Sequence, residues 1–351
     1  MDEPLLHERS RMDHPLVQLT LVRFREFIRE PEALFWVFVF PILLAAGLGI
    51  AFRNRPPDVL PVAATTPEIA RALGQDKLLR VRTLSVADAE EALRTGRIVL
   101  AAEPSAGPSV VYRFDSTNPD GRTARMLVDA DIQKAAGRTD PVPSSENLVR
   151  EPGARYIDFL VPGLLGMNLM GSAIWGMGFA IVDARRKRLI KRLVATPMPR
   201  QYYLASFLLS RLALLAIEVF AVAGFGHFVF GVPLRGSLLD LAALCVFGSL
   251  SFSALGLLIA SRAKTIEAAS GLMNVTMMPM WIVSGVFFSS ERFPAALQPV
   301  IQALPLTAVN SALRANMLQG AGLAQVSSQI GVLSVWLVAC FALALKLFRW
   351  R

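Results

Sequence analysis

The chain has 351 residues, of which 54% are hydrophobic and 18% are charged, and its formal net charge is +9. A soluble domain carries nearer a quarter charged residues, and the apolar residues here gather into runs of about 20, the length of helix that crosses a bilayer. This composition excludes a soluble protein built around one large core and favours an α-helical integral membrane protein.

The first part of the chain, residues 1–32, is polar and charged and ends in an amphipathic pattern. Apolar and basic side chains between Pro15 and Glu32 fall broadly on opposite sides of a helix, which predicts a helix in the membrane interface. Pro31 ends it. The alternative is a merely solvated start. The apolar run 33–52 follows without a cleavage site, so we expect an uncleaved first transmembrane helix.

Residues 53–155 are more polar and alternate the patterns of strands and helices. The Ser85 hydroxyl, with Asp88 three residues later, forms a near capping box. The predicted strands are 59–65, 78–84, 98–102 and 110–114, the predicted helices are 67–74, 85–96 and 119–136, and the linker back to the membrane is 139–153. This pattern predicts a small α/β domain. It contains no cysteine, so we expect no disulfide in it.

Five further apolar runs lie in residues 156–351: 156–182, 203–232, 238–261, 266–288 and 326–348. Cys245 and Cys340 fall inside two of them. Residues 289–325 are too polar to span and too apolar for a free loop, so we expect short helices in the outer leaflet, broken at prolines. The fold predicted is a polytopic protein with six transmembrane helices and an α/β domain inserted between the first and second.

Lysine and arginine gather in residues 1–32, in the loop 183–202, after the fourth predicted span and in the tail. Because short cytoplasmic loops carry the basic excess, both termini are expected to be cytoplasmic and residues 53–155 extracytoplasmic. A basic chain also suggests nucleic acid as a partner. Anionic lipid headgroups explain the charge better, so we expect membrane lipid and no nucleic acid.

Several kinds of chemistry have no motif here. The sequence lacks the Gly-x-x-x-x-Gly-Lys-Ser/Thr loop that binds ATP phosphates and the Gly-x-Ser-x-Gly nucleophile elbow. His7, His14 and His227 have no metal-ligand spacing to cysteines or carboxylates. We therefore expect no catalytic residue, no metal site and no cofactor held by this chain.

Two charges inside the third predicted span are functional candidates, because intramembrane charges are costly. Arg211 and Glu218 are seven residues apart, on one helix face and two turns apart. We expect this separation to be too long for direct contact, so that each meets a partner from elsewhere. The alternative is a structural pair or interhelical bond.

Methionines recur in the second and fifth predicted spans, among them Met170, Met177, Met273 and Met277. Methionine suits adaptable apolar contact, which favours a drug-like or lipid-like cargo. Ordinary helix packing is the alternative for any single methionine.

Four segments, in order and spacing, carry a resemblance over nearly the whole chain. The chain resembles the ABC type-2 transporter permeases, in the bacterial exporter branch with a large domain after the first span. The segments are Arg29-Glu30-Pro31; Leu93-Arg94-Thr95-Gly96 with Phe114-Asp115-Ser116-Thr117-Asn118-Pro119; Arg186 to Pro197; and Gly285-Val286-Phe287-Phe288 with Arg292-Phe293-Pro294, Pro305-Leu306-Thr307 and Arg314.

The resemblance implies an elbow helix with Arg25, Arg29 and Glu30, and a coupling helix in the loop 183–202. The apolar side chains of this loop also suit a helix-in-groove contact with a partner. The alternative is that the loop is only a charge cluster that sets topology. The sequence departs from the family where a Glu and a Gly usually precede Leu-x-x-x-Pro: the nearest acid is Asp183, and Arg188 occupies the Gly position. The implied coupling residues are Asp183, Arg186, Arg188, Leu189, Lys191, Arg192, Leu193 and Pro197.

The resemblance also implies partners and a location. Two copies of a cytoplasmic ATPase subunit would bind ATP and Mg²⁺, and two permease chains, as a homodimer, would form the pathway in a bacterial inner membrane. Residues expected at that pathway or interface are Arg211, Glu218, Met170, Met177, Met273, Met277 and Phe287. The alternatives are a non-transporting scaffold or sensor with an extracellular ligand-binding domain, and a membrane-embedded enzyme, which the absent catalytic motifs disfavour.

Overall fold

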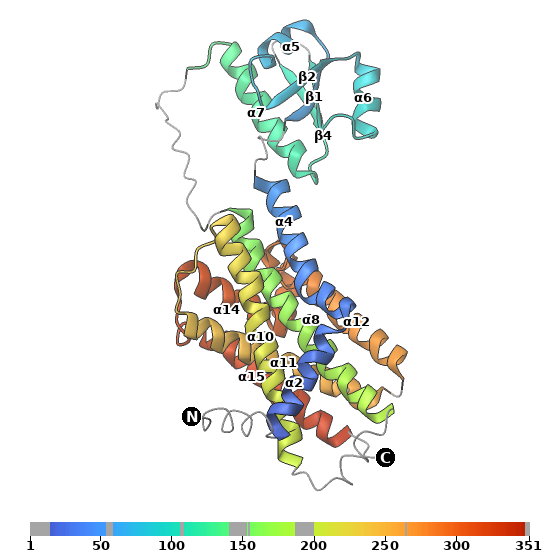
Figure 1. The fold of residues 1–351 in the computed structure, drawn as a ribbon. Helices are drawn as coiled ribbons and strands as arrows, with labels where there is room; N and C mark the ends of the chain where they lie inside the picture. The colour runs from blue at the N-terminus through green and yellow to red at the C-terminus, as the bar shows by residue number, and fades with distance from the viewer. Residues whose placement is uncertain are drawn as a thin grey trace. The chain divides into compact units, whose positions relative to one another are not determined.

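The computed structural model describes residues 15–53, 59–105, 109–139, 153, 155–186, 200–263 and 265–347. The chain divides into two compact units (Figure 1). We call Asn54–Val149 the inserted domain, and Met1–Arg53 together with Arg150–Arg351 the membrane unit. The coupling helix expected from Arg186 to Pro197 lies almost entirely outside the described residues.

The inserted domain is a four-stranded mixed sheet in the order β2-β1-β3-β4. Strand β1 runs parallel to β2 and β3, and β3 pairs antiparallel with β4, with Val62 opposite Leu100 and Leu100 opposite Phe114. The strands are β1 Leu60–Ala64, β2 Leu79–Thr83, β3 Leu100–Pro104 and β4 Val110–Phe114, and the helices are α5 Pro67–Leu73, α6 Val86–Arg94 and α7 Pro119–Ala135.

The two faces of this sheet bury different side chains. Val62 and Leu100 pack with α5 and α7, whereas Ala63 and Ala101 face the alanines of α6. This separation follows from the two-residue period of a strand, in which successive side chains point to opposite faces of the sheet. Only β3 is displaced, beginning two residues after its predicted start.

Side-chain caps begin the helices of the inserted domain. Ser85 Oγ accepts a hydrogen bond from the Asp88 amide at 3.2 Å, which confirms the predicted cap. Thr66 Oγ1 and Asn118 Oδ1 accept in the same way at the starts of α5 and α7. Each cap gives one otherwise unpaired amide a partner, and explains where the helix begins.

The first described helix of the membrane unit is α2, Pro15–Ile28, within the segment predicted to be amphipathic. The first span is continuous but has three parts: α3 Pro31–Leu34, a π-helix Phe35–Val39, and α4 Phe40–Arg53. Pro41 has no amide hydrogen to donate to the preceding turn. The π-helix is a single-turn insertion of the kind found inside α-helices, and it lies immediately before α4, in which Pro41 is the second residue.

Five described helices are long and apolar enough to cross a membrane. They lie at Pro31–Ala51, Tyr156–Val182, Leu209–Phe230, Leu238–Arg262 and Ser327–Leu347. The last four belong to α8 Tyr156–Arg186, α10 Arg200–Phe230, α11 Leu238–Arg262 and α15 Ser327–Leu347. The sequence predicted six spans, and the structure supports five by length and composition.

The remaining predicted span, 266–288, contains the shorter helix α12, Ile266–Val283, with Pro279 inside it. The helix stops because Ser284 caps it and Gly285 takes a left-handed conformation with φ 73°. Beyond it the chain breaks at Pro294 and Pro305, as predicted. The pieces are two 3₁₀ turns, Ser290–Arg292 and Ala295–Leu297, then α13 Gln298–Gln302 and α14 Pro305–Gln319.

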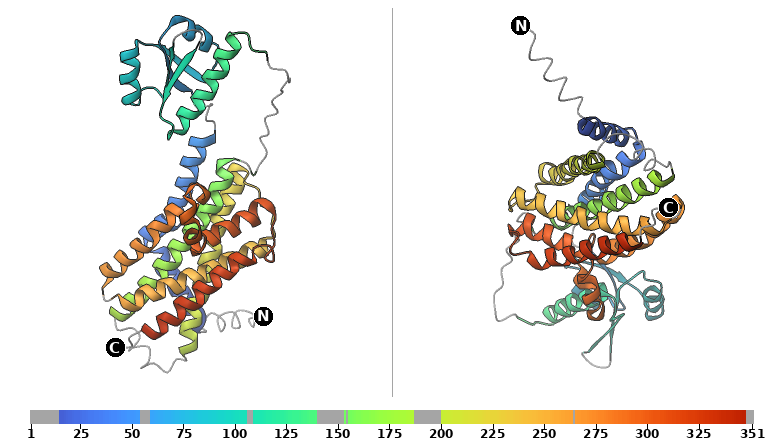
Figure 2. Two further views of the ribbon diagram at one scale, coloured as in Figure 1. Left: turned by 180° about the vertical axis from the view of Figure 1, so that it is seen from behind. Right: turned by 90° about the horizontal axis from the view of Figure 1, so that it is seen from below.

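Helix α8 is the centre of the membrane unit. In its spanning segment 83% is buried, against at most 50% in the other four, and it packs on α4, α10, α11, α12 and α14 (Figure 2). Glycines allow these helices to approach: a Cβ on Gly163 would lie 2.6 Å from the Val286 carbonyl oxygen, and one on Gly256 would lie 2.7 Å from that of Ile174.

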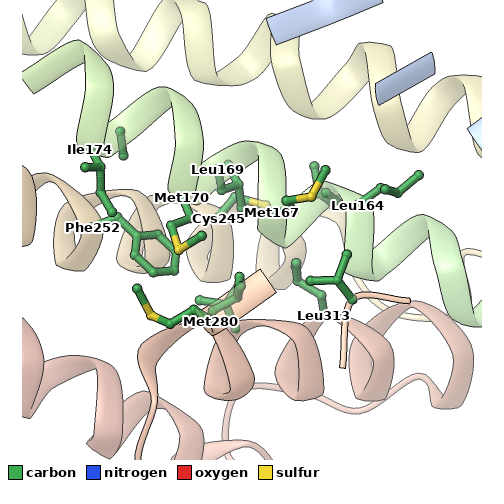
Figure 3. Close-up of a cluster of buried hydrophobic side chains, with 14 of the residues drawn as sticks. Leu164, Met167, Leu169, Met170, Ile174, Cys245, Phe252, Met280 and Leu313 are labelled. Atoms are coloured by element: carbon green, nitrogen blue, oxygen red, sulfur yellow. The ribbon is translucent and has the colours of Figure 1, made fainter. Parts of the chain in front are cut away.

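Large apolar side chains fill the space around α8. Leu164, Met170 and Ile174 of α8 meet Phe252 of α11 and Met280 of α12 in one cluster (Figure 3). The two free cysteines, Cys245 and Cys340, are buried in the same core. The core therefore binds α8 to helices that come later in the chain.

Candidate functional site

The strongest polar site inside the membrane unit joins α8, α10 and α11. Arg211 Nη1 of α10 lies 3.2 Å from Glu218 Oε1 of the same helix. Ser172 Oγ of α8 donates to Glu218 Oε2 at 2.7 Å and accepts from Arg211 Nη2 at 2.9 Å. Arg211 Nη2 also reaches Ser249 Oγ of α11, at 3.4 Å. We call these four residues the Arg211 network.

The expectation that Arg211 and Glu218 are too far apart for direct contact is wrong. Seven residues rise about 10 Å along a helix, and an extended arginine together with a glutamate covers that distance. The expectation of partners from elsewhere holds, because Ser172 and Ser249 come from other helices. Neither serine carried a signal in the sequence.

Burial explains why the Arg211 network is so well bonded. The Glu218 side chain is 0% exposed and that of Arg211 is 17% exposed. A buried ion is tolerated only with close partners for its charge and lone pairs. Arg211 Nε alone has no partner in the structure as described. The arrangement suits a clamp between three helices.

A second buried carboxylate lies where α8 begins. Asp158 is fully buried, forms a bidentate pair with Arg155 at 2.8 and 2.9 Å, and accepts from the Gly153 amide at 2.8 Å. Arg155 also donates to the Gly231 carbonyl oxygen after α10, at 3.0 Å. Its hydrogen bond to Asp158 raises the pKa of Arg155. These contacts fasten the first turn of α8 to the end of α10.

The methionines proposed for a pathway lie mostly within this chain's own core. Met170, Met273 and Met277 are buried, and Met177 is half-buried, as is Phe287. Figure 3 shows Met170 among the side chains of the core around α8. Packing therefore accounts for the three buried methionines, and a role for any of the five in transport stays a prediction.

The residues expected to contact a cytoplasmic ATPase are only partly described. Arg25, Arg29 and Glu30 are exposed at the end of α2 and the start of α3, and α2 packs along α10. Asp183 and Arg186 belong to the last turn of α8. The other six coupling residues, Arg188, Leu189, Lys191, Arg192, Leu193 and Pro197, lie outside the described residues.

Among the described residues, no group of three or more His, Cys, Asp or Glu side chains is placed to hold a metal ion. The polar groups that the structure does bring together hold helices to one another. Two of them, Asn310 and Arg314 of α14, were not singled out as site residues by the sequence, although Arg314 belongs to one of its recognised segments.

Comparison with known proteins identifies the family. Residues 31–346 match the model of the ABC-2 family transporter proteins. The inner membrane transport permease YadH of Escherichia coli is 27% identical over 201 residues, 56% of this chain and 76% of YadH. Nodulation protein J of Rhizobium meliloti is 28% identical over 207 residues, 58% of this chain and 77% of that protein.

A third relative carries a more specific name. The probable multidrug ABC transporter permease YbhS of Escherichia coli is 26% identical over 216 residues, which cover 60% of this chain and 52% of YbhS. YadH and YbhS are both named permeases. The family model covers most of the chain. The chain belongs to the ABC-2 family of transporter proteins and is a membrane transport permease.

Proposed function

We propose that this chain is the permease subunit of an ATP-driven exporter that moves hydrophobic or amphipathic molecules out of the cytoplasm or the inner leaflet. The family match over residues 31–346 carries this proposal. Two copies of a separate cytoplasmic subunit bind ATP with Mg²⁺, and a second copy of this chain completes the pathway in a bacterial inner membrane.

The described helices support a coupling route through the loop between α8 and α10. This loop joins the most buried helix of the membrane unit to α10, along which the amphipathic α2 packs. Force applied to the loop therefore reaches α8 and α10 directly and, through the packing of α8, also α4, α11, α12 and α14. In this proposal both termini and the loop are cytoplasmic, and the inserted domain is extracytoplasmic.

Helix α12 is the sixth span in this proposal and contributes to the apolar surface met by the cargo. Its inner face, with Met273, Met277 and Met280, is buried in the core. Its opposite face exposes Val275, Met278 and Ile282. An exposed apolar stripe suits lipid tails or a cargo of similar chemistry.

The test is to purify the chain with its ATPase, reconstitute both in vesicles, and measure ATP-dependent movement of a fluorescent phospholipid and a Hoechst dye. Leu189→Ser with Leu193→Ser keeps the loop charge and should reduce transport roughly tenfold, because it removes the apolar groups that enter a partner groove. The matched control, Lys191→Gln with Arg192→Gln, keeps those apolar groups.

The two variants separate coupling from topology. If only the charge variant loses transport, with inverted insertion, the loop sets topology and the coupling role is wrong. If no ATPase associates with the wild-type chain, and neither probe moves with ATP, the exporter proposal fails and a scaffold or sensor accounts better for the chain.

A further inference from the structure

The outer end of α12 leaves backbone carbonyl groups in a buried place. The helix ends at Val283, and Ser284, Gly285 and Val286 are buried. The last carbonyls of a helix have no partner within it, and burying them unpaired in a membrane protein is unfavourable. Partners must therefore come from other elements.

Helix α14 supplies two of those partners. Asn310 Nδ2 donates to the Ser284 carbonyl oxygen at 2.9 Å, and Arg314 Nη2 donates to the Gly285 carbonyl oxygen. Asn310 and Arg314 are four residues apart, so they lie on one face of α14. Together the two side chains of α14 cap the C-terminal end of α12.

Arg314 also joins this cap to α8. Its guanidinium carbon lies 3.6 Å from the centre of the Phe159 ring, and its Nε donates to the Phe159 carbonyl oxygen at 3.2 Å. Within the described ranges, no carboxylate forms an ion pair with Arg314. Its charge instead faces carbonyl oxygens, which a cation at the C-terminal end of a helix stabilises.

Glycines on α8 provide the space for this arrangement. A Cβ on Gly163 would lie 2.6 Å from the Val286 carbonyl oxygen and 3.0 Å from Arg314 Nη2, and one on Gly166 would collide with Asn310 Oδ1. Three helices thus meet through polar contacts and close backbone packing. We call Phe159, Ser284, Gly285, Asn310 and Arg314 the α12 joint.

We propose that Asn310 and Arg314 are positioning residues that hold the outer end of α12 on α8, and that productive transport depends on this attachment. The inference rests on the proposed function, because it concerns how motion passes between the helices of the permease. Without the joint, the outer end of α12, with the exposed apolar face beside it, is no longer held to the motion of α8. ATP hydrolysis then continues while less cargo moves for each ATP.

The test compares Arg314→Lys and Asn310→Leu with Arg292→Lys, a matched change at an exposed arginine of the same outer segment. The readout is fluorescent phospholipid moved per ATP hydrolysed by the reconstituted complex. We expect this ratio to fall by roughly fivefold or more, the scale of a coupling energy between sites, in the two joint variants and to stay unchanged in the control.

Hydrogen exchange in residues 284–289 gives a second readout that needs no transport. The joint variants should exchange faster there, and Arg292→Lys should not. If the ratio of transport to ATP use is unchanged and only the yield of folded protein falls, both residues act in folding and the proposal is overturned. Unchanged hydrogen exchange in residues 284–289 of the joint variants would overturn it as well. A wild-type complex without ATP-dependent transport contradicts the proposed function instead, and the exchange experiment still decides whether the joint holds α12.

Discussion

At the scale of single residues, the Arg211 network separates a structural role from a transport role. Glu218→Gln leaves the buried Arg211 charge without its carboxylate, and breaking a buried pair costs about 3–5 kcal/mol. We expect a clear loss of thermal stability in detergent. Replacing both residues, with Arg211→Met and Glu218→Leu, removes the unpaired charge and should restore much of that stability.

Export by these two variants decides the role of Glu218. If the double variant is folded and exports normally, the pair only holds the helices together. If it is folded but does not export, the pathway or interface role predicted from the sequence is supported. Equal stability of the single and double variants would contradict the view that the lone arginine causes the damage.

The inserted domain has a carboxylate whose pKa predicts a pH effect. Burial first, and then the neighbouring Asp76, raise the pKa of Asp131 above 3.8. Unfolding therefore releases a proton, so this group lowers stability as pH rises from about 3.8 through the raised pKa. Asp131→Asn should remove that loss and slow hydrogen exchange in α7 at neutral pH.

Asp115 is the matched control for Asp131, because its pKa is shifted the other way. The hydroxyl and amide of Thr117 donate to its carboxylate and hold the pKa of Asp115 below 3.8. Its contribution to stability is present at neutral pH and is lost as pH falls through the lowered pKa. Slower exchange in Asp115→Asn at neutral pH, or faster exchange in Asp131→Asn, would contradict the assigned signs.

At the scale of elements, α8 offers two glycines with opposite surroundings. Gly166→Ala places a methyl group against Asn310 Oδ1, whereas Gly176 has no atom within 4 Å of an added Cβ. Gly166→Ala should therefore reduce the yield and thermal stability of the membrane unit. Gly176→Ala should be neutral or stabilise by up to about 1 kcal/mol, the helix propensity difference.

Size-exclusion profiles after heating measure both glycine variants in one experiment. The contrast matters more than either value, since both substitutions change the same helix in the same way. Similar melting of Gly166→Ala and the wild type would mean that α14 relaxes away from α8 easily, and would weaken the argument for a tight joint there.

Sequence patterns predicted most elements because one physical signal determines each of them. Apolar, strand-like runs placed the four strands, with a two-residue alternation in 78–84. Ser85 marked the start of α6 by its cap. The end of α12 was missed, because apolar residues continue to Phe288 while Gly285 changes the backbone direction. Hydropathy measures transfer into lipid and carries no information about a left-handed residue.

The polar sites were predicted only in part for a similar reason. Arg211 and Glu218 are conspicuous because charges are rare in apolar helices. Ser172, Ser249 and Asn310 are ordinary residues in sequence, and become important only when folding brings α8, α10, α11 and α14 together. Contacts between helices distant in sequence cannot be inferred from the periodicity of one helix.

At the scale of the whole molecule, the loop between α8 and α10 and the α12 joint lie at different ends of one route through α8. Helix α8 has 31 residues, about 46 Å at the usual rise per residue, which exceeds the thickness of a hydrocarbon core. It thus connects that loop to the joint as one helix, with Pro162 inside it. The double serine variant of the loop and the joint variants test the two ends of this route.

The two cysteines make the chain well suited to chemical labelling. Cys245 and Cys340 are only 1% and 3% exposed, and the sequence contains no others. Thiol reagents that stay in water should react with the folded wild-type protein slowly, since both sulfurs are enclosed by the core. A cysteine introduced on a polar surface then reports its own side of the membrane, without prior removal of the natural thiols.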